Sequence, residues 1–333
     1  MKTTDPALRL YAGDRSGHWS DGNISNAVRV LERFKASLSV PLLSATKLDA
    51  QAYLTDRRVN GRYQGRPISV NTVIVEHRQI VSFFKWAADE DGGGLIERNP
   101  MRGLKAPKGV VADPADTPVL TEEEYRALLA AAGARKPKQS QYAGRSMNAR
   151  RDQAILALMW STGGRRAEIA GLRLRDIDWD TQMVHFAKTK SRSTTAKSRD
   201  CYFDDDALRY LTRYVMERGD HDGPLFESQR RVPGAEYRPG IKADAITLLL
   251  RRLAKVTGLS SAALTSAHSF RRAVATAWLE SGGSVRDLET NHGWKHDGRM
   301  ASHYTRAAET AQAASEARRI SEARRRGRHL RSA

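Results

Sequence analysis

Residues 267–308 read AHSFRRAVATAWLESGGSVRDLETNHGWKHDGRMASHYTRAA and gather several chemically versatile side chains. His268 and Arg271 have the spacing H-x-x-R, so they would lie one turn apart on the same face of a helix. Trp294 and Tyr304 follow in the same stretch. Tyr304 lies in the polar context SHYTR, which gives a tyrosine little reason to be there for packing.

A further arginine lies upstream, in residues 161–172, which read STGGRRAEIAGL. Arg165 follows a Gly-Gly turn into an expected helix, and a helix N-terminus favours anions. Arginine binds phosphodiester oxygens through charged, bidentate hydrogen bonds, and these oxygens gain charge when the bond is attacked. One arginine among 56 basic residues would indicate only a surface charge. Two arginines, a histidine and a tyrosine together predict chemistry on a phosphodiester.

The net charge of +18 over 333 residues indicates a polyanionic partner. We favour nucleic acid over an acidic membrane, because no long amphipathic helix carries a bulky apolar face. The single cysteine, Cys201, excludes an intrachain disulfide and is typical of a reducing compartment. The N-terminal residues form no apolar leader, and the longest apolar run, residues 154–160, is too short to cross a bilayer. We therefore expect a cytoplasmic, nucleoid-associated protein without a membrane partner.

The chain length and the pattern of apolar residues predict two domains. Polar residues 1–17 predict a flexible extension, and residues 18–106 an all-α bundle. A proline-containing linker covers 107–118, a mainly helical domain 119–310, and a basic tail 311–333. Capping boxes at residues 46–49 and 121–124 predict two helix starts. The expected fold class is mainly α (α+β), with a small antiparallel sheet in the second domain.

That sheet is predicted from two short alternating segments, 183–187 and 201–203, with a basic loop between them. The loop carries Lys188 and Lys190, and either would be able to protonate a leaving oxygen. A tyrosine nucleophile stores the energy of the cut strand in a phosphotyrosyl bond, so that rejoining needs no ATP. In the helix that starts near His268, we expect four buried residues: Phe270, Val274, Ala277 and Trp278.

Metal and nucleotide chemistry find no support in the sequence. There is no paired-acid group and no H-E-x-x-H, and His292 and His296, four residues apart, lack a convincing third ligand. A P-loop pattern is also absent. We therefore expect no cofactor, no NTP and no catalytic metal.

Four motifs in this order resemble the tyrosine recombinase (phage integrase) family over residues 18–310. STGGRRAEIAGLRLRDIDW is similar to the family's first arginine motif, with Arg165 as the catalytic arginine and Glu168 as the supporting acid. Residues 268–271 resemble the H-x-x-R motif. NHGW resembles the family's segment that ends in His or Trp, and Trp294 occupies that last position. HYTRA resembles the nucleophile motif, with Tyr304 as the tyrosine.

The resemblance implies a core-binding domain and a catalytic domain that clamp one half-site of a double-stranded DNA recombination site. It implies a homotetramer on two synapsed sites and strand exchange through 3′-phosphotyrosine intermediates, and it leaves open a directionality factor as a further partner. Arg165 and Arg271 would hold the scissile phosphate, while Lys190 would protonate the leaving oxygen. His268 would act in acid–base exchange, and Trp294 would pack and hydrogen-bond at the phosphate.

Some features depart from the family pattern. The spacing from Trp294 to Tyr304 is one residue longer than usual, so His296 is an alternative to Trp294. Arg272 stands where the family often has a second histidine. Two other functions share the same residues: a catalytically silent DNA-binding relative, and a strand-cutting enzyme similar to type IB topoisomerases or telomere resolvases. A silent relative should lack the tyrosine or an arginine, and neither is missing here.

Overall fold

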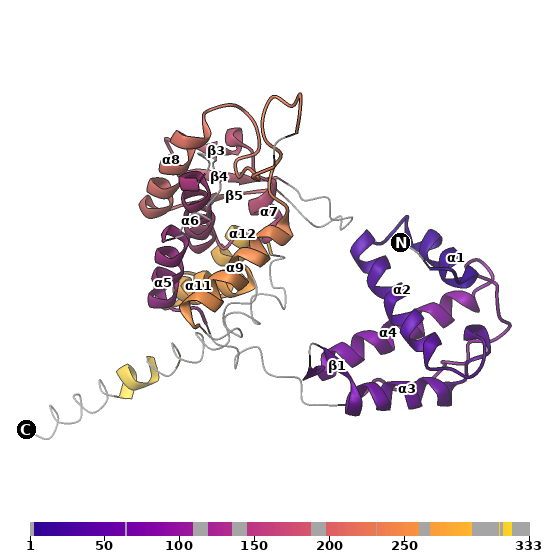
Figure 1. Ribbon diagram of the computed structural model, residues 1–333. Helices are drawn as coiled ribbons and strands as arrows, with labels where there is room; N and C mark the ends of the chain where they lie inside the picture. The colour runs from indigo at the N-terminus through magenta and orange to yellow at the C-terminus, as the bar shows by residue number, and fades with distance from the viewer. Residues whose placement is uncertain are drawn as a thin grey trace, which may run out of the picture. The chain divides into compact units, whose positions relative to one another are not determined.

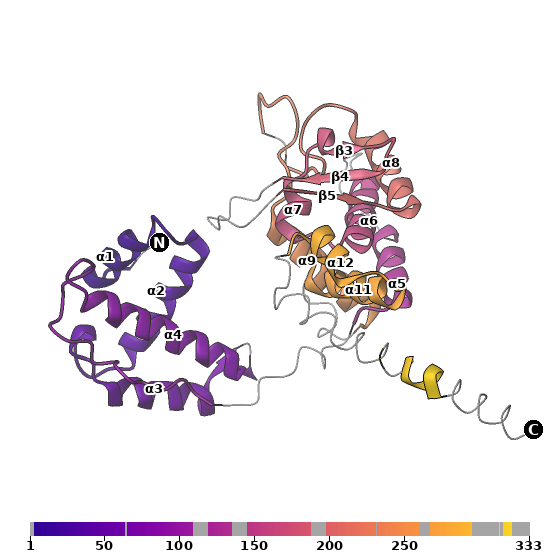
Figure 2. The ribbon, with the colours of Figure 1, turned by 180° about the vertical axis from the view of Figure 1, so that it is seen from behind.

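The computed structural model describes residues 3–63, 65–108, 119–134, 145–187, 198–230, 232–259, 267–294, 313 and 316–321. The chain divides into two compact units, Met1–Ala112 and Asp113–Ala333 (Figures 1 and 2). The division falls inside the stretch 107–118, where the sequence predicts a linker. Each unit has its own apolar core.

The first unit is a helical bundle in which α4 packs against the other three helices. Its helices begin where the sequence supplies side-chain caps: Asp5, Ser20, Thr46 and Ser69 each accept a hydrogen bond from the first turn. A short antiparallel hairpin, whose strands β1 and β2 have two residues each, connects α3 with α4. The elements are α1 (Pro6–Arg15), α2 (Asp21–Ala36), η1 (Leu42–Ser44), α3 (Lys47–Asn60), β1 (Arg62–Tyr63), β2 (Arg66–Pro67) and α4 (Val70–Ala87).

Helix α1 corrects the prediction of a flexible N-terminal extension over residues 1–17. Leu8 and Tyr11 are fully buried, and the Tyr11 ring lies 5.4 Å from Phe83 and 5.1 Å from Trp86 between centroids. Asp5 caps the helix and Pro6 occupies its first turn. These apolar contacts, together with the hydrogen bond between Tyr11 and Ser82 and the ion pair between Asp5 and Lys35, attach α1 to the bundle.

The second unit is built around the apolar helix α6, which contacts α5, α8 and α11. A small sheet lies at one end of the unit, with α12 packed against β5 (Figure 2). The helices are α5 (Glu122–Gly133), α6 (Arg145–Thr162), α7 (Arg166–Gly171), α8 (Asp205–Arg218), α9 (Ala243–Thr257), α11 (Ala267–Glu280) and α12 (Val285–His292), and a 3-10 turn, η3, covers Leu174–Asp176.

The sheet of the second unit confirms the predicted hairpin and adds a strand to it. Strands β3 (Ile177–Asp178), β4 (Met183–Phe186) and β5 (Arg199–Tyr202) are antiparallel in the order β3-β4-β5. Val184 pairs with Cys201, and both are buried. In β5 the buried residues alternate with exposed ones, so Arg199 and Cys201 face the interior.

Helix α11 buries a different face from the one expected. Phe270 is buried as predicted, but Val274 and Trp278 are half-buried and Ala277 is exposed. The buried residues instead include Arg271, which is 2% exposed. The Arg271 guanidinium is buried because it donates to two backbone carbonyls, as described below, so the buried face of α11 includes a charged residue that an apolar pattern does not predict.

Two further observations concern the chain as far as the structure describes it. No helix in the described ranges is both long and apolar enough to span a membrane. Of the predicted basic tail, residues 313 and 316–321 are described, and they are helical and exposed.

Candidate active site

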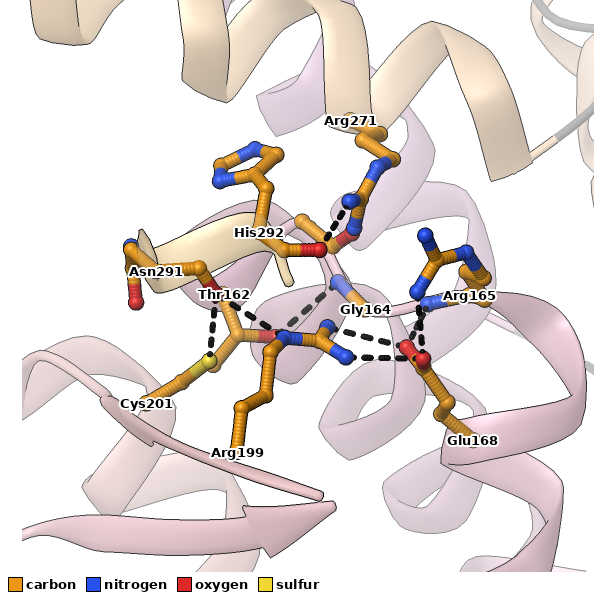
Figure 3. A network of polar contacts seen from close by, with 10 residues as sticks. Thr162, Gly164, Arg165, Glu168, Arg199, Cys201, Arg271, Asn291 and His292 are labelled. Carbon is orange, nitrogen blue, oxygen red and sulfur yellow. Dashed lines mark hydrogen bonds and ion pairs between the residues drawn. The ribbon is translucent and has the colours of Figure 1, made fainter. Parts of the chain in front are cut away.

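The predicted first arginine lies at the start of α7, and Glu168 holds it from the same turn. The Arg165 backbone N–H donates to Glu168 Oε2 at 2.8 Å, and the Arg165 Nη1 donates to Glu168 Oε1 at 2.7 Å (Figure 3). Glu168 is buried, while the Arg165 side chain is 41% exposed. Arg165 is therefore tethered on one side and accessible on the other.

A second arginine, Arg199, binds the same carboxylate from the opposite side. Its Nη1 and Nη2 donate to Glu168 Oε1 and Oε2 at 2.7 and 2.9 Å, and its Nε donates to the Asn291 carbonyl at 2.9 Å. The Cys201 thiol donates to the same carbonyl at 3.1 Å. Sequence reasoning missed Arg199. Its inward position in β5, where a strand of this pattern should carry an apolar residue, is the signal that indicates it.

Glu168 stays ionised inside this cluster. Burial on its own raises the pKa of a carboxyl group. The hydrogen bonds and charge of Arg199, then the backbone N–H and charge of Arg165, overcome this effect and lower the pKa of Glu168 to about 2. The cluster therefore contains a carboxylate, not a carboxylic acid, at every physiological pH.

Arg271 enters the site from α11. Its Nη1 donates to the Gly163 carbonyl at 2.9 Å, and its Nη2 donates to the His292 carbonyl. Its Cζ lies 5.0 Å from the centre of the Trp294 ring. Arg271 thus joins the turn before α7 to the end of α12, and the predicted Arg165, Arg271 and Trp294 come together in one place.

The Gly-Gly turn before Arg165 is needed for close packing. Gly163 has a φ of +60°, and a Cβ at this position would lie 3.0 Å from the His292 Nε2. A Cβ on Gly164 would lie 2.7 Å from the Ile169 Cδ1. The two glycines therefore let the backbone of the turn lie close to α12 and α7. In this position the Gly163 carbonyl accepts the hydrogen bond from Arg271.

His268 lies one turn before Arg271 on α11, and its side chain is exposed whereas that of Arg271 is buried. Partial burial of its ring lowers the pKa of His268, and the positive charges of Arg271 and Arg165 lower it further. His268 is therefore mainly neutral at neutral pH. A neutral imidazole can accept a proton.

His292 is a second histidine of the site, and it was considered in the sequence only as a metal ligand. It is fully buried, with its ring centre 4.8 Å from that of Trp294. Burial, then the charges of Arg271 and Arg199, lower the pKa of His292 to about 2. Neither ring nitrogen has a hydrogen-bond partner in the part of the chain that the structure describes. Its spacing of four residues from Leu288, which is also buried, is the sequence signal for its inward position.

The remaining predicted residues cannot be placed. Tyr304, Lys190, Lys188 and His296 all lie outside the described residues. Within the described ranges, no group of three His, Cys, Asp or Glu side chains is arranged to hold a metal ion.

The arrangement suits an oxyanion. Arg165 and Arg199 share the carboxylate of Glu168, and Arg271 adds a third guanidinium that binds backbone carbonyls, so these four side chains carry an excess of positive charge. An anion that docks at the exposed side of Arg165 would meet a fixed, charged donor beside a histidine with a lowered pKa. This combination can hold a phosphodiester and exchange a proton next to it.

Comparison with known proteins identifies the family of the chain. The sequence model described as "Phage integrase family" matches residues 118–311. The chain is 28% identical to tyrosine recombinase XerC 2 of Ralstonia nicotianae over 225 residues. This aligned segment covers 68% of this chain and 58% of the relative. It therefore spans less than two thirds of that relative. Tyrosine recombinase XerA of Pyrococcus horikoshii is 23% identical over 269 residues, 81% of this chain and 79% of the relative.

Solved structures show the same fold. The crystal structure of a lambda integrase dimer bound to a COC′ core site superposes with a TM-score of 0.66 at 19% identity, covering 91% of this chain and 77% of that chain. The described elements are mainly helical with small antiparallel sheets, as predicted. The expected fold class is therefore confirmed.

Proposed function

The chain belongs to the phage integrase family of tyrosine recombinases, and from this membership we propose that it is a site-specific recombinase. It cuts and rejoins double-stranded DNA through a 3′-phosphotyrosine intermediate, without ATP or a metal ion. One observation carries the proposal: Arg165 and Arg271, from separate helices, meet in a single cluster with excess positive charge. Such a cluster supports a site for a scissile phosphate.

In the proposed reaction, the Tyr304 oxygen forms a bond to phosphorus while the bond from phosphorus to the 5′ oxygen breaks. His268, neutral because its pKa is lowered, accepts the tyrosyl proton. Lys190 donates a proton to the leaving 5′ oxygen. A 5′ hydroxyl that attacks the phosphotyrosine reverses these steps, so the bond energy is kept and the strand is rejoined.

The partners follow from this reaction. Recombination exchanges strands between two DNA sites, and each site has two cleavage positions, so four protomers are needed. We propose a homotetramer on synapsed DNA at the nucleoid, with a directionality factor as a further partner. The lambda integrase structure, which is a dimer bound to a core site, supports an assembly in which two protomers share one site.

The test is a suicide-substrate trap. Purified protein is mixed with nicked DNA from the inverted repeats that flank its own gene, and covalent adduct is measured on a denaturing gel. Wild-type protein should form a protease-sensitive adduct, and Tyr304→Phe should form none while it still retards the DNA in a native gel. Tyr202→Phe is the matched control, because Tyr202 is 55% exposed on β5 and should keep the adduct.

Two outcomes would contradict the proposal. Adduct formed by Tyr304→Phe would mean that another residue is the nucleophile. DNA that is retarded but never linked to the wild-type protein would favour the catalytically silent alternative.

A further inference from the structure

Arg199 is a buried arginine at the start of β5, and its guanidinium is fixed on several sides. Two N–H groups meet the two oxygens of Glu168, and the Nε donates to the Asn291 carbonyl. Its Cζ also lies 4.6 Å from the centre of the Phe186 ring. A planar fork with this many fixed partners has one orientation, so Arg199 is a rigid part of the site (Figure 3).

The Glu168 carboxylate is divided between two arginines. Oε1 accepts from Arg165 Nη1 and from Arg199 Nη1, each at 2.7 Å. Oε2 accepts from the Arg165 backbone N–H at 2.8 Å and from Arg199 Nη2 at 2.9 Å. Arg199 thus occupies the buried side of the carboxylate, and the Arg165 side chain stays 41% exposed. This exposed side is where an anion would reach Arg165.

Without Arg199, Glu168 would be a buried carboxylate with one cationic partner. A buried charge that loses its partner is costly, so the remaining cation is drawn towards it. Arg165 would then turn more of its fork to Glu168, because a bidentate pair is the preferred geometry of arginine and carboxylate. Fewer of its N–H groups would face the exposed side.

We propose that Arg199 is a positioning residue for DNA strand cleavage: it satisfies Glu168 from the buried side, so that Arg165 keeps its fork available to the scissile phosphate. This role rests on the function proposed above. Arg199 acts through Glu168 and does not contact the phosphate.

The position of Arg199 in the fold supports this role. The Asn291 carbonyl that it binds precedes His292, whose own carbonyl holds Arg271. Arg199 therefore connects β5 with α7 and with the end of α12, the elements beside both predicted catalytic arginines. The sequence between β4 and β5 also carries Lys190.

The experiment measures single-turnover cleavage of the suicide substrate at saturating protein, together with DNA affinity and thermal melting. Arg199→Ala should bind DNA like wild type but cleave about 10²-fold more slowly, the scale expected when a catalytic group is misplaced. Arg199→Lys should fall between the two, because an ammonium keeps the charge but not the fork. If Arg199→Ala does not fold, Arg199→Lys carries the comparison.

A double variant separates positioning from mere structural support. In Arg199→Ala/Glu168→Gln, the carboxylate that captures Arg165 is gone, so cleavage should recover towards the rate of Glu168→Gln alone. A structural role predicts the opposite: the two losses add, and the double variant is the slowest. Additive losses, or equal cleavage by Arg199→Ala and wild type, would overturn the proposal.

Arg218→Ala is the matched control. Arg218 is also a buried arginine of the second unit, but it donates to the carbonyls of Gly219, His221 and Pro224. Its loss should lower the melting temperature and leave the cleavage rate of the folded protein unchanged. If Arg218→Ala slows cleavage as much as Arg199→Ala does, the effect is general and the proposal is wrong. If wild-type protein forms no adduct, the proposed function fails first, and this role fails with it.

Discussion

His292 is a neutral imidazole surrounded by positive charge. Burial is the largest cause of its lowered pKa, and Arg271 and Arg199 lower it further, to about 2. The ordinary value is 6.5, which the unfolded chain should show. Below this value the unfolded state binds a proton that the folded state excludes. The stability that His292 contributes is therefore complete above pH 6.5 and is lost as the pH falls from there towards 2.

This difference predicts a pH dependence of folding stability. Between about pH 7.5 and about pH 5.5, the free energy of unfolding of the wild type should fall by about 1.4 kcal/mol more than that of His292→Gln. Urea unfolding at the two pH values measures the difference. His268→Gln is the control, because the exposed His268 should contribute less. Equal pH slopes for wild type and His292→Gln would show that folding does not lower the pKa of His292, and would contradict this account.

Single residues also mark the limit of sequence reasoning. Arg165, Arg271 and Trp294 were found through their motifs, and the structure brings them together. Arg199 was not found, because Glu168 and Asn291 are 31 and 92 residues away and no local pattern names them. The structure extends the strand predicted over residues 201–203 back to Arg199, which places this charged residue at an inward position. A partner for such a charge is required, since an unpaired buried charge is costly.

At the scale of elements, the sequence predicts where helices begin better than it predicts which face of a helix is buried. The capping boxes at Thr46 and Thr121 are present as predicted, because a cap depends on residues only three positions apart. The attachment of α1 was not predictable in this way. It depends on Tyr11 meeting α4, some seventy residues later.

The cap of α3 gives a test of the first unit. The Thr46 hydroxyl accepts a hydrogen bond from the Asp49 N–H at 3.3 Å and donates to its carboxylate at 2.7 Å. Thr46→Ala should lower the free energy of unfolding of this unit by about 1 kcal/mol. Thr55→Ala is the control, because Thr55 is exposed inside α3, where alanine favours the helix. Equal stabilities of the two variants in urea unfolding would contradict the cap.

At the scale of the whole molecule, the net charge of +18 is a property that composition alone gives. It predicts steep salt dependence of DNA binding, because each phosphate that is neutralised releases counterions. If about 6–10 phosphates are contacted, affinity should fall roughly 10³–10⁵-fold between about 50 and 200 mM salt. Fluorescence anisotropy with labelled DNA measures this, and sucrose at matched osmolality serves as the control. An affinity that does not change with salt would contradict binding to the DNA backbone.

The central claim is that Tyr304 becomes linked to DNA, and peptide mapping of the trapped adduct tests it most directly. Adduct from the suicide substrate is digested with trypsin and nuclease, and the modified peptide is sequenced by mass spectrometry. Trypsin should release residues 300–306, MASHYTR, carrying a nucleotide on Tyr304. A nucleotide on any other peptide, with residues 300–306 recovered unmodified, would contradict the assignment of the nucleophile.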